Sequence, residues 1–259
     1  MLALWTYFVL SFFANAMIFH PSPYPEGAWD LQHAFDAEDV WLEAADGAKV
    51  HGWFVPAAAE SRFVTLYLHG NAGNITDRRG HIEAIRNTGS PLLIIDYRGF
   101  GKTPGKPSEQ SVYLDADAAY EYLLGRGYAP GQIILHGESL GTGVAVDLAS
   151  RRPCAGVILE APFPSVGAVA HRVIPFVGPF IVSGFETGQK IAKINAPLLI
   201  IHGDQDETIA FDLGREVFDL AREPKSFWRV PGAHHNDIIL TAGMTVYEAR
   251  LREFQQSLP

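Results

Sequence analysis

The sequence is nearly free of cysteine, because Cys154 is the only one in 259 residues. A single cysteine excludes an intrachain disulfide, and an isolated cysteine usually packs as a small apolar residue. The sequence also lacks the Cys and His spacing of a zinc site, the Walker pattern and the dinucleotide-binding glycine pattern. We therefore predict that the protein uses no metal and no other cofactor.

Basic residues are scarce as well. Lys and Arg number 20 against 29 Asp and Glu, so the formal net charge is −9, and no run of basic residues occurs. Nucleic-acid-binding proteins neutralise phosphates with clustered Lys and Arg. The composition therefore argues against a nucleic acid as partner and against strong attraction to anionic lipid headgroups. It does not predict an oligomeric state.

The N-terminal part has no Lys or Arg before Lys49, and it is mostly apolar from Leu2 to Phe19. A helix over this run is about 27 Å long, which matches the hydrocarbon core of a bilayer. We predict that residues 1–20 form a membrane-anchor helix, with membrane association through residues 2–19. One alternative is a signal peptide cut near Ala14-Asn15-Ala16, although the basic n-region is missing. The other is a helix packed on the core.

The remaining residues, 21–259, are numerous enough to bury one substantial core as a single catalytic domain. Hydrophobic residues make up 47% of the chain, which excludes disorder. Several acidic residues lie between positions 26 and 39, just after the predicted anchor. They favour a catalytic domain on the non-cytoplasmic side of the membrane.

Short runs rich in leucine or β-branched residues alternate with longer helical patterns. This alternation predicts an α/β fold with a mainly parallel sheet flanked by helices on both faces. Asp46-Gly47 joins the first two runs as an antiparallel hairpin at the sheet edge. We expect eight strands, near residues 38–43, 49–55, 62–68, 91–96, 132–137, 155–160, 197–202 and 226–231. We expect helices near residues 75–87, 109–125, 139–151, 208–221 and 237–257.

The most informative motif is Gly137-Glu138-Ser139-Leu140-Gly141, a G-x-S-x-G pattern between an apolar run and a segment of small residues. Glycines on both sides let the backbone bend sharply and leave the serine hydroxyl exposed at a strand-to-helix turn. Ser139 is therefore the candidate nucleophile. A serine hydroxyl is weakly nucleophilic at neutral pH, so a catalytic Ser139 requires a histidine base and a carboxylate that orients it.

Candidates for both partners follow in chain order. An acidic turn at Asp204-Gln205-Asp206-Glu207 ends one apolar run, and His234-His235 follows another. The order Ser, Asp, His is the one expected of an α/β-hydrolase, and it differs from the orders of chymotrypsin-like and subtilisin-like proteases.

The chain resembles the α/β-hydrolase superfamily, and within it the small serine hydrolases of the Bem46 and ABHD13/ABHD17-like group. The matching segments lie within residues 38–257 and are Leu68–Asn74, Asp96–Lys102, Gly137–Gly141, His202–Asp206 and His235–Asp237. The resemblance implies the α/β-hydrolase fold and an enzyme that hydrolyses acyl compounds. It does not name the substrate.

The resemblance also assigns roles. Its H-G-x-x-D pattern places the catalytic carboxylate at Asp206, while Asp204 caps a turn or helix. Its G-x-x-H-N-D pattern selects His235 as the base, and leaves His234 a structural or solvent-facing role. In the turn Asp96–Gly101 we expect an acid and a guanidinium to brace the backbone. For His69, His136 and His202 we expect hydrogen bonds near turns.

Acyl transfer also requires two backbone N–H groups that stabilise the oxyanion. The residue after the nucleophile, Leu140, supplies one of these groups. The second should come from the turn after residues 63–68, where glycines let the backbone approach the substrate. We choose Asn71, with Ala72 as the next candidate.

Residues 163–190 interrupt the alternation with aromatic and β-branched residues broken by prolines. We predict no regular amphipathic element there, but a small apolar cap over an acyl-binding pocket. The cap residues expected to contact substrate are Phe163, Ile174, Phe176 and Phe180. The alternative is a helix packed on the core without substrate contact.

Together these features predict a serine carboxylic ester hydrolase that acts on short- to medium-chain or lipid-like acyl esters. An acyl-protein thioesterase is the nearest alternative enzyme, and a peptidase is a more distant one. A non-catalytic hydrolase fold that binds a ligand is the alternative from a different class. The presence of Ser139, Asp206 and His235 in the expected order favours the enzyme.

Overall fold

The fold is an α/β sandwich built on one large sheet. The computed structural model describes residues 18–57, 61–173 and 183–259, and within them eight strands form the sheet. Its order is β2-β3-β6-β4-β7-β8-β9-β10, and all neighbours are parallel except that β3 runs antiparallel to both β2 and β6. The strands are β2 (Glu38–Glu43), β3 (Lys49–Val55), β4 (Val64–Leu68), β6 (Leu92–Ile95), β7 (Ile133–Glu138), β8 (Gly156–Glu160), β9 (Leu198–Gly203) and β10 (Lys225–Val230). The predicted mainly parallel, eight-stranded sheet with an antiparallel edge hairpin is confirmed.

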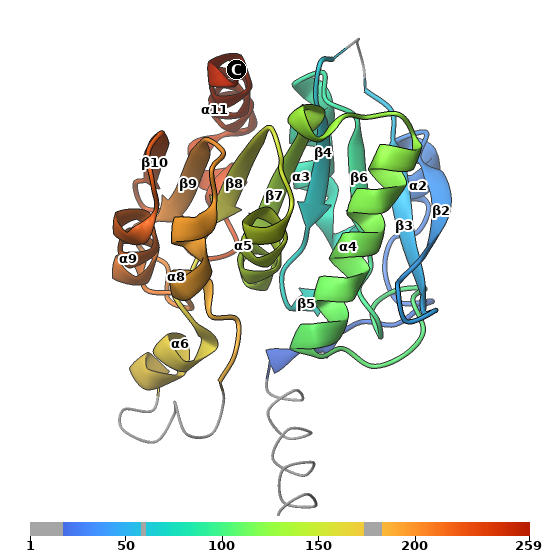
Figure 1. Cartoon of the computed structure of the whole chain (residues 1–259), viewed down its shortest axis with the longest axis horizontal. Helices are drawn as coiled ribbons and strands as arrows, with labels where there is room; N and C mark the ends of the chain where they lie inside the picture. The colour runs from blue at the N-terminus through green and yellow to red at the C-terminus, as the bar shows by residue number, and fades with distance from the viewer. Residues whose placement is uncertain (1–17, 58–60, 174–182) are drawn as a thin grey trace, which may run out of the picture.

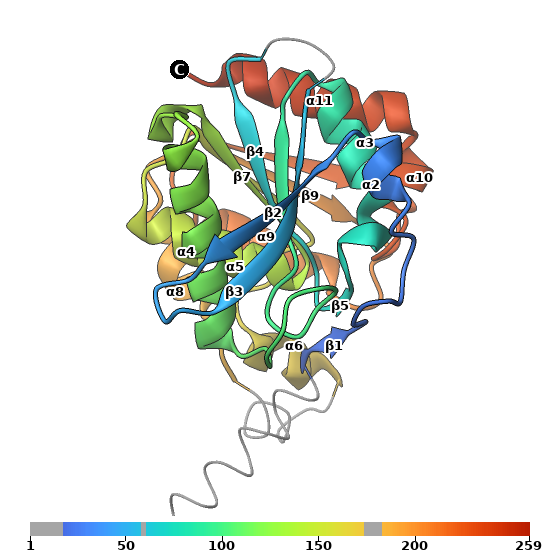
Figure 2. The same cartoon turned by 90° about the vertical axis from the view of Figure 1, so that its right-hand side faces the viewer.

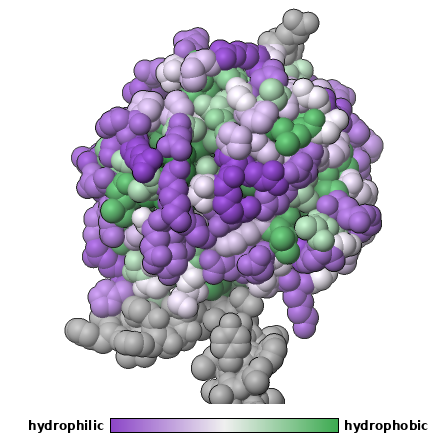
Figure 3. Space-filling model, in the orientation of Figure 1, coloured by the Kyte–Doolittle hydropathy of each residue, from purple (hydrophilic) through white to green (hydrophobic). Residues whose placement is uncertain are grey.

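Helices cover both faces of the sheet (Figures 1 and 2). One face carries α4 (Glu109–Gly125), α5 (Leu140–Arg151), α8 (Thr187–Lys190) and α9 (Phe211–Leu220). The other carries α3 (Arg79–Asn87), α10 (Ile238–Ala242) and α11 (Met244–Ser257). Two buried apolar clusters lie on the two sides of the sheet. The surface in Figure 3 is mostly polar, with apolar groups in small separate patches.

The burial of each strand explains its sequence. The central strands β4, β6, β8 and β9 are buried at every position, and each is an almost continuous apolar run. Parallel strands covered by helices on both faces require this composition. Edge strand β2 alternates instead, because only one of its faces packs on the core. Its Val40 and Leu42 point inward, whereas Trp41 is half exposed.

Several predicted helices have different limits in the structure. The first begins as a 3-10 turn, η1 (Ile75–Arg78), before α3, and the last is divided into α10 and α11 at Gly243. Gly243 has a φ of 83°, which an α-helix cannot contain. Short elements were not predicted: β1 (His20–Pro21), β5 (Ala72–Gly73), α2 (Leu31–Ala34), η2 (Pro130–Gln132) and η3 (Ile191–Lys193).

The predicted lack of a regular element in residues 163–190 was wrong. Helix α6 (Val166–Val173) lies there, at the end of the molecule where the parallel strands terminate (Figure 1). Pro164 precedes the helix, and the hydroxyl of Ser165 accepts the N–H of Ala168 at 3.1 Å. A proline and a serine just before a helix favour its start. Ile174, Phe176 and Phe180 lie outside the described residues.

The predicted anchor helix of residues 1–20 lies almost wholly outside the described residues. Within residues 18–57, 61–173 and 183–259, no helix is long and apolar enough to cross a bilayer. The end of the apolar run belongs to the catalytic domain, because Phe19 is only 5% exposed and packs in the main core. The predicted domain boundary at residue 20 therefore falls within strand β1.

Gly141 permits the close packing of α5 against β4. A Cβ at this position would overlap the backbone carbonyl oxygen of Leu68. We predict that Gly141→Ala lowers the free energy of unfolding in urea by about 1–3 kcal/mol or more, as overpacking does. The matched control is Gly125→Ala at the end of α4, where nothing lies within 4 Å of an added Cβ. It should be neutral or stabilise by up to about 1 kcal/mol. Equal stability of the two variants would contradict this packing argument.

Candidate active site

Ser139 lies at the turn between β7 and α5, at the end of the sheet where the parallel strands terminate. Its φ is 51°, a strained value for a residue other than glycine. Its N–H donates to the carbonyl of Glu160 on β8 at 2.8 Å, which holds the turn in place. A Cβ on Gly137 would overlap the carbonyl of Gly141, so both flanking glycines are required by close backbone contact. The predicted nucleophile elbow is therefore present.

The structure brings Ser139, His235 and Asp206 together in one hydrogen-bonded chain. Ser139 Oγ lies 3.0 Å from His235 Nε2, and His235 Nδ1 lies 2.8 Å from Asp206 Oδ2. An ionised carboxylate can only accept, so Nδ1 carries the proton and Nε2 accepts the serine hydroxyl. The other oxygen of Asp206 accepts the N–H groups of Thr208 and Ile209 at 2.9 and 2.7 Å.

Electrostatics favour the charge states that a general base needs. Burial opposes ionisation of Asp206, but hydrogen bonds from His202 and His235 and from the Ile209 N–H outweigh it and hold the pKa of this carboxyl well below its ordinary value. Burial also opposes protonation of His235, but the hydrogen bond and charge of Asp206, with the charges of Glu138 and Glu160, raise its pKa. Asp206 thus stays ionised and stabilises an imidazolium.

Asp204 and His234, the neighbouring alternatives to Asp206 and His235, form hydrogen bonds with other residues. Asp204 accepts from Arg229 at 2.8 Å and from the N–H of Gly232 at 2.8 Å, so it braces the turn after β10. The side chain of His234 is 56% exposed, and it pairs with Glu207 at 3.0 Å. Their hydrogen bonds therefore match the structural roles predicted for them.

The two predicted oxyanion donors flank the serine. Leu140 is the first residue of α5, where backbone N–H groups have no partner within the helix. Asn71 follows β4, and among the described residues no acceptor bonds to the backbone N–H of either residue. His69 Nδ1 lies 2.7 Å from the carbonyl oxygen of Gly70. Because C=O and N–H point in opposite directions in a trans peptide, this bond orients the Asn71 N–H.

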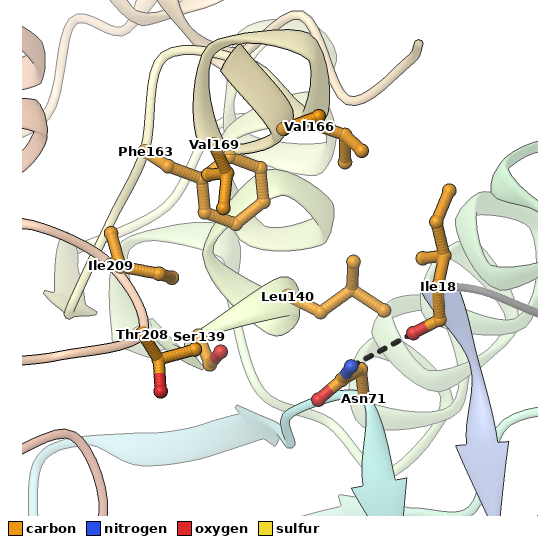
Figure 4. Close-up of a pocket in the computed structure, with 10 residues that line it drawn as sticks. Ile18, Asn71, Ser139, Leu140, Phe163, Val166, Val169, Thr208 and Ile209 are labelled. Atoms are coloured by element: carbon orange, nitrogen blue, oxygen red, sulfur yellow. Dashed lines mark hydrogen bonds between the residues drawn. The ribbon is translucent and has the colours of Figure 1, made fainter. Parts of the chain in front are cut away.

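A cavity of about 190 Å³ opens next to Ser139 (Figure 4). The structure places Phe163, one of the predicted cap residues, in its wall. Ser139, Leu140 and Asn71, which the sequence also predicted as site residues, line it too. Val166, Val169 and Ala170 lie in the predicted cap segment but were not among the residues named for substrate contact, and Ile18, Thr208 and Ile209 were not predicted. The three from α6 are spaced i, i+3 and i+4, the apolar pattern of one helix face, which would have predicted both the helix and its contact with the cavity.

A second, larger cavity of about 640 Å³ is lined in part by His235. Glu138 lies in its wall. Its Oε2 is 2.8 Å from Arg78 Nε and accepts the hydroxyl of Tyr67 at 2.7 Å. Burial opposes ionisation of Glu138, but the charge of Arg78 and these contacts lower its pKa to about 2.

Glu160, which also lines this cavity, binds His81 at 3.1 Å and the hydroxyl of Tyr247 at 2.6 Å. The sequence analysis did not predict these buried charged groups near Ser139. The only sequence feature that indicated them was the position of Glu138 within the G-x-S-x-G motif.

Two structural expectations were wrong. Both ring nitrogens of His136 lack a hydrogen-bond partner among the described residues, and burial lowers its pKa to about 4. Its ring packs against that of Tyr67 instead. Asp96 and Arg98 do not brace one turn together. Asp96 accepts the N–H of Ile75 at 3.0 Å, whereas Arg98 pairs with two other acids, Asp46 and Asp115.

Comparisons with known proteins identify the family of the chain. The profile of the family described as serine aminopeptidase, S33, matches residues 59–183. Alpha/beta hydrolase domain-containing protein 17C of Mus musculus is 37% identical over 227 residues, which cover 86% of this chain and 69% of that protein. An uncharacterized protein of Mycobacterium tuberculosis is 38% identical over 221 residues, with 83% and 78% coverage.

Solved structures show the same fold. An esterase of Pyrococcus furiosus has a TM-score of 0.76 at 21% identity and covers 93% of this chain and 98% of its own. An alpha-beta hydrolase of Vibrio vulnificus has a TM-score of 0.72 at 22% identity, with 86% and 84% coverage. With the sequence relatives, these matches show that the chain belongs to the α/β-hydrolase superfamily, in the ABHD17-like group, and is a hydrolase.

Proposed function

We propose that the protein is a serine carboxylic ester hydrolase. The observation that carries this proposal is the hydrogen-bonded chain of Ser139, His235 and Asp206 beside an apolar cavity. A protein that only binds a ligand does not need an ionised carboxylate, an oriented histidine and a strained serine joined by hydrogen bonds. Each of these features has a defined role in acyl transfer.

In the proposed mechanism, Ser139 Oγ attacks the acyl carbonyl carbon while its proton passes to His235 Nε2. The carbonyl oxygen becomes an oxyanion that accepts the N–H groups of Leu140 and Asn71. Collapse of this intermediate breaks the ester bond, and His235 gives its proton to the departing alcohol. Water, deprotonated by His235, then attacks the acyl-enzyme and releases the acid. Asp206 keeps the imidazole oriented throughout.

The acyl group is the part of the substrate that the first cavity suits. Its walls are mostly aliphatic or aromatic, with Phe163, Val169 and Ile209 among them (Figure 4). A volume of about 190 Å³ holds roughly six groups the size of a water molecule, at about 30 Å³ each. This supports short- to medium-chain acyl esters. Rates of hydrolysis of thioesters and peptides with the same acyl group would test the two alternative activities, thioesterase and peptidase.

Membrane association through residues 2–19 stays a prediction, as does the side of the membrane on which the domain lies. The predicted anchor on which both depend falls almost entirely outside the described part of the chain. Esters presented on vesicles, compared with the same esters in solution, would test a preference for lipid-like substrates.

We predict that Ser139→Ala reduces ester hydrolysis by at least about 10⁴-fold and abolishes labelling by a fluorophosphonate probe, because the members of a triad act as one unit. The matched control is Ser150→Ala, the same substitution at the other end of α5, which should retain activity and labelling. Circular dichroism and thermal unfolding establish that both variants are folded. A folded Ser139→Ala protein with near-native turnover would exclude Ser139 as nucleophile.

The raised pKa of His235 predicts how activity depends on pH. The base must be neutral, so kcat/KM should fall as the pH drops through a value above 6.5, the ordinary pKa of histidine. Asp206→Asn removes a charge that stabilises the imidazolium. The acidic limb should therefore move to lower pH, while kcat falls by about 10³-fold or more.

Asp204→Asn, two residues away, serves as the control for this pH profile. It should leave the acidic limb and kcat close to those of the wild type, because Asp204 contacts Arg229 and not His235. An acidic limb that stays in place in Asp206→Asn, or moves in Asp204→Asn, would reverse the assignment of the two acids.

Acyl-chain preference should follow the size of the first cavity. Each buried methylene contributes about 0.8 kcal/mol, so kcat/KM should rise by about fourfold per carbon from the acetyl ester until the cavity is full. Val169→Phe should shift the optimum to shorter chains. Val246→Phe, on an exposed position of α11, is the control and should not. An optimum at acetyl in the wild type would rule out this role for the cavity.

A further inference from the structure

Residues Ile18–Ser22, here called the strap, lie directly beside the proposed active site. The strap contains strand β1, which runs parallel to strand β5 in the loop that holds Asn71 (Figure 2). These two strands form a separate two-stranded sheet, and β5 has no other strand neighbour among the described residues. The side chain of Ile18 lines the cavity next to Ser139 (Figure 4).

Hydrogen bonds tie the strap to this loop at several points, among them one of 3.0 Å from the side-chain amide of Asn74 to the carbonyl of Ser22. The N–H of His20 donates to the carbonyl of Asn71 at 2.8 Å, and the N–H of Ser22 donates to the carbonyl of Gly73 at 2.9 Å. The side-chain amide of Asn71 donates to the carbonyl of Ile18 at 2.8 Å (Figure 4). Asn71 is therefore held at its carbonyl group and at its side chain.

The sequence of the strap fits this pairing. Donors to one neighbour occur at alternate residues of a strand, here His20 and Ser22. Pro21 lies between them, at the position whose missing N–H costs no bond to the loop. On its other side, the carbonyl of Ser22 accepts the N–H of Gly101 at 3.1 Å. The strap thus lies between the Asn71 loop and the turn that follows β6.

Phe19 fixes the strap to the body of the domain. Its ring centroid lies 6.4 Å from that of Phe100 and 6.2 Å from that of Phe185, and the side chain is buried. Full burial of an aromatic side chain contributes far more than one exposed hydrogen bond. The backbone on either side of Phe19 therefore has a defined position from which to hold the loop.

We propose that the strap is a positioning element of the active site, in which the backbone N–H of His20 fixes the orientation of Asn71. This inference rests on the proposed role of the Asn71 N–H as an oxyanion donor. His69 holds the peptide before Asn71 through the carbonyl of Gly70, and His20 holds the peptide after it. Fixing both peptides fixes both backbone dihedrals of Asn71, so its N–H is oriented before the oxyanion forms.

The test uses two substitutions at one residue in the full chain. His20→Pro removes the N–H and places a ring carbon against the Asn71 carbonyl, whereas His20→Ala keeps the N–H. The His20 side chain is exposed, so His20→Ala should behave as wild type. His20→Pro should lower kcat by about 10²-fold on a soluble ester, as expected when an oxyanion donor is lost or misplaced by about 1 Å, with little change in KM.

Binding of a trifluoromethyl ketone distinguishes positioning from a general structural defect. This inhibitor forms an oxyanion with the serine, so His20→Pro should weaken its binding by about the same factor as kcat. Binding of the carboxylic acid product should change little. Asn71→Ala, which keeps the backbone N–H but loses the bond to Ile18, is a second variant and should show the same pattern with a smaller loss of about tenfold.

The outcomes separate this inference from the proposed function. If His20→Pro does not fold, as judged by thermal unfolding, Asn71→Ala decides. If the folded variants keep kcat and inhibitor binding within about twofold of the matched control, the strap does not position Asn71, while an inactive Ser139→Ala still supports the esterase. If kcat falls without weaker inhibitor binding, the inference also fails. An active Ser139→Ala would instead overturn the proposed function itself.

Discussion

The strained turn at Ser139 is the constraint on which the rest of the structure depends. A serine at a φ of 51° persists only because the surrounding backbone holds it. The carbonyl of Glu160 accepts its N–H, and the hydroxyl of Thr142 donates to its carbonyl at 2.6 Å. Strand β7 lies between β4 and β8, so the loops after both neighbours reach the nucleophile. The central position of β7 therefore determines which loops can supply the oxyanion donors and the support for the turn.

Two carboxylates, Glu138 and Glu160, lie close to this turn. Their burial is unfavourable by itself, but their negative charges raise the pKa of His235. Burial of an unpaired carboxylate costs several kcal/mol, yet Glu138 and Glu160 both lie next to the turn. Each is satisfied by one cation or histidine and one tyrosine hydroxyl. Their negative charges act on His235 in the same direction as Asp206 and favour its protonated form. In the proposed mechanism, the pairs that stabilise the turn thus also support proton transfer to the base.

The sequence predicts those parts of the fold that are encoded by neighbouring residues. The eight strands were found within a few residues because each is a short apolar run between turn signals, and Ser139, Asp206 and His235 lie in short motifs. The strap was not predicted, since the bond from Asn71 to Ile18 joins residues 53 positions apart. Hydropathy also cannot distinguish a side chain that enters a bilayer from one that enters a core. Phe19 was therefore assigned to an anchor, whereas it packs against Phe100 and Phe185.

His235 is linked to two cavities of opposite character, because it contacts Ser139 in the wall of the smaller one and itself lines the larger one. On the side of Ser139, the smaller cavity is lined mainly by apolar side chains, where hydrocarbon is favoured over water. The larger cavity is lined by Arg78, Glu138 and Glu160, whose charges are largely buried. In the proposed mechanism the imidazole must accept a proton next to the acyl group and later take one from water. An apolar wall alone would oppose the imidazolium, and a charged wall alone would not retain an acyl chain, so each cavity supplies what the other lacks.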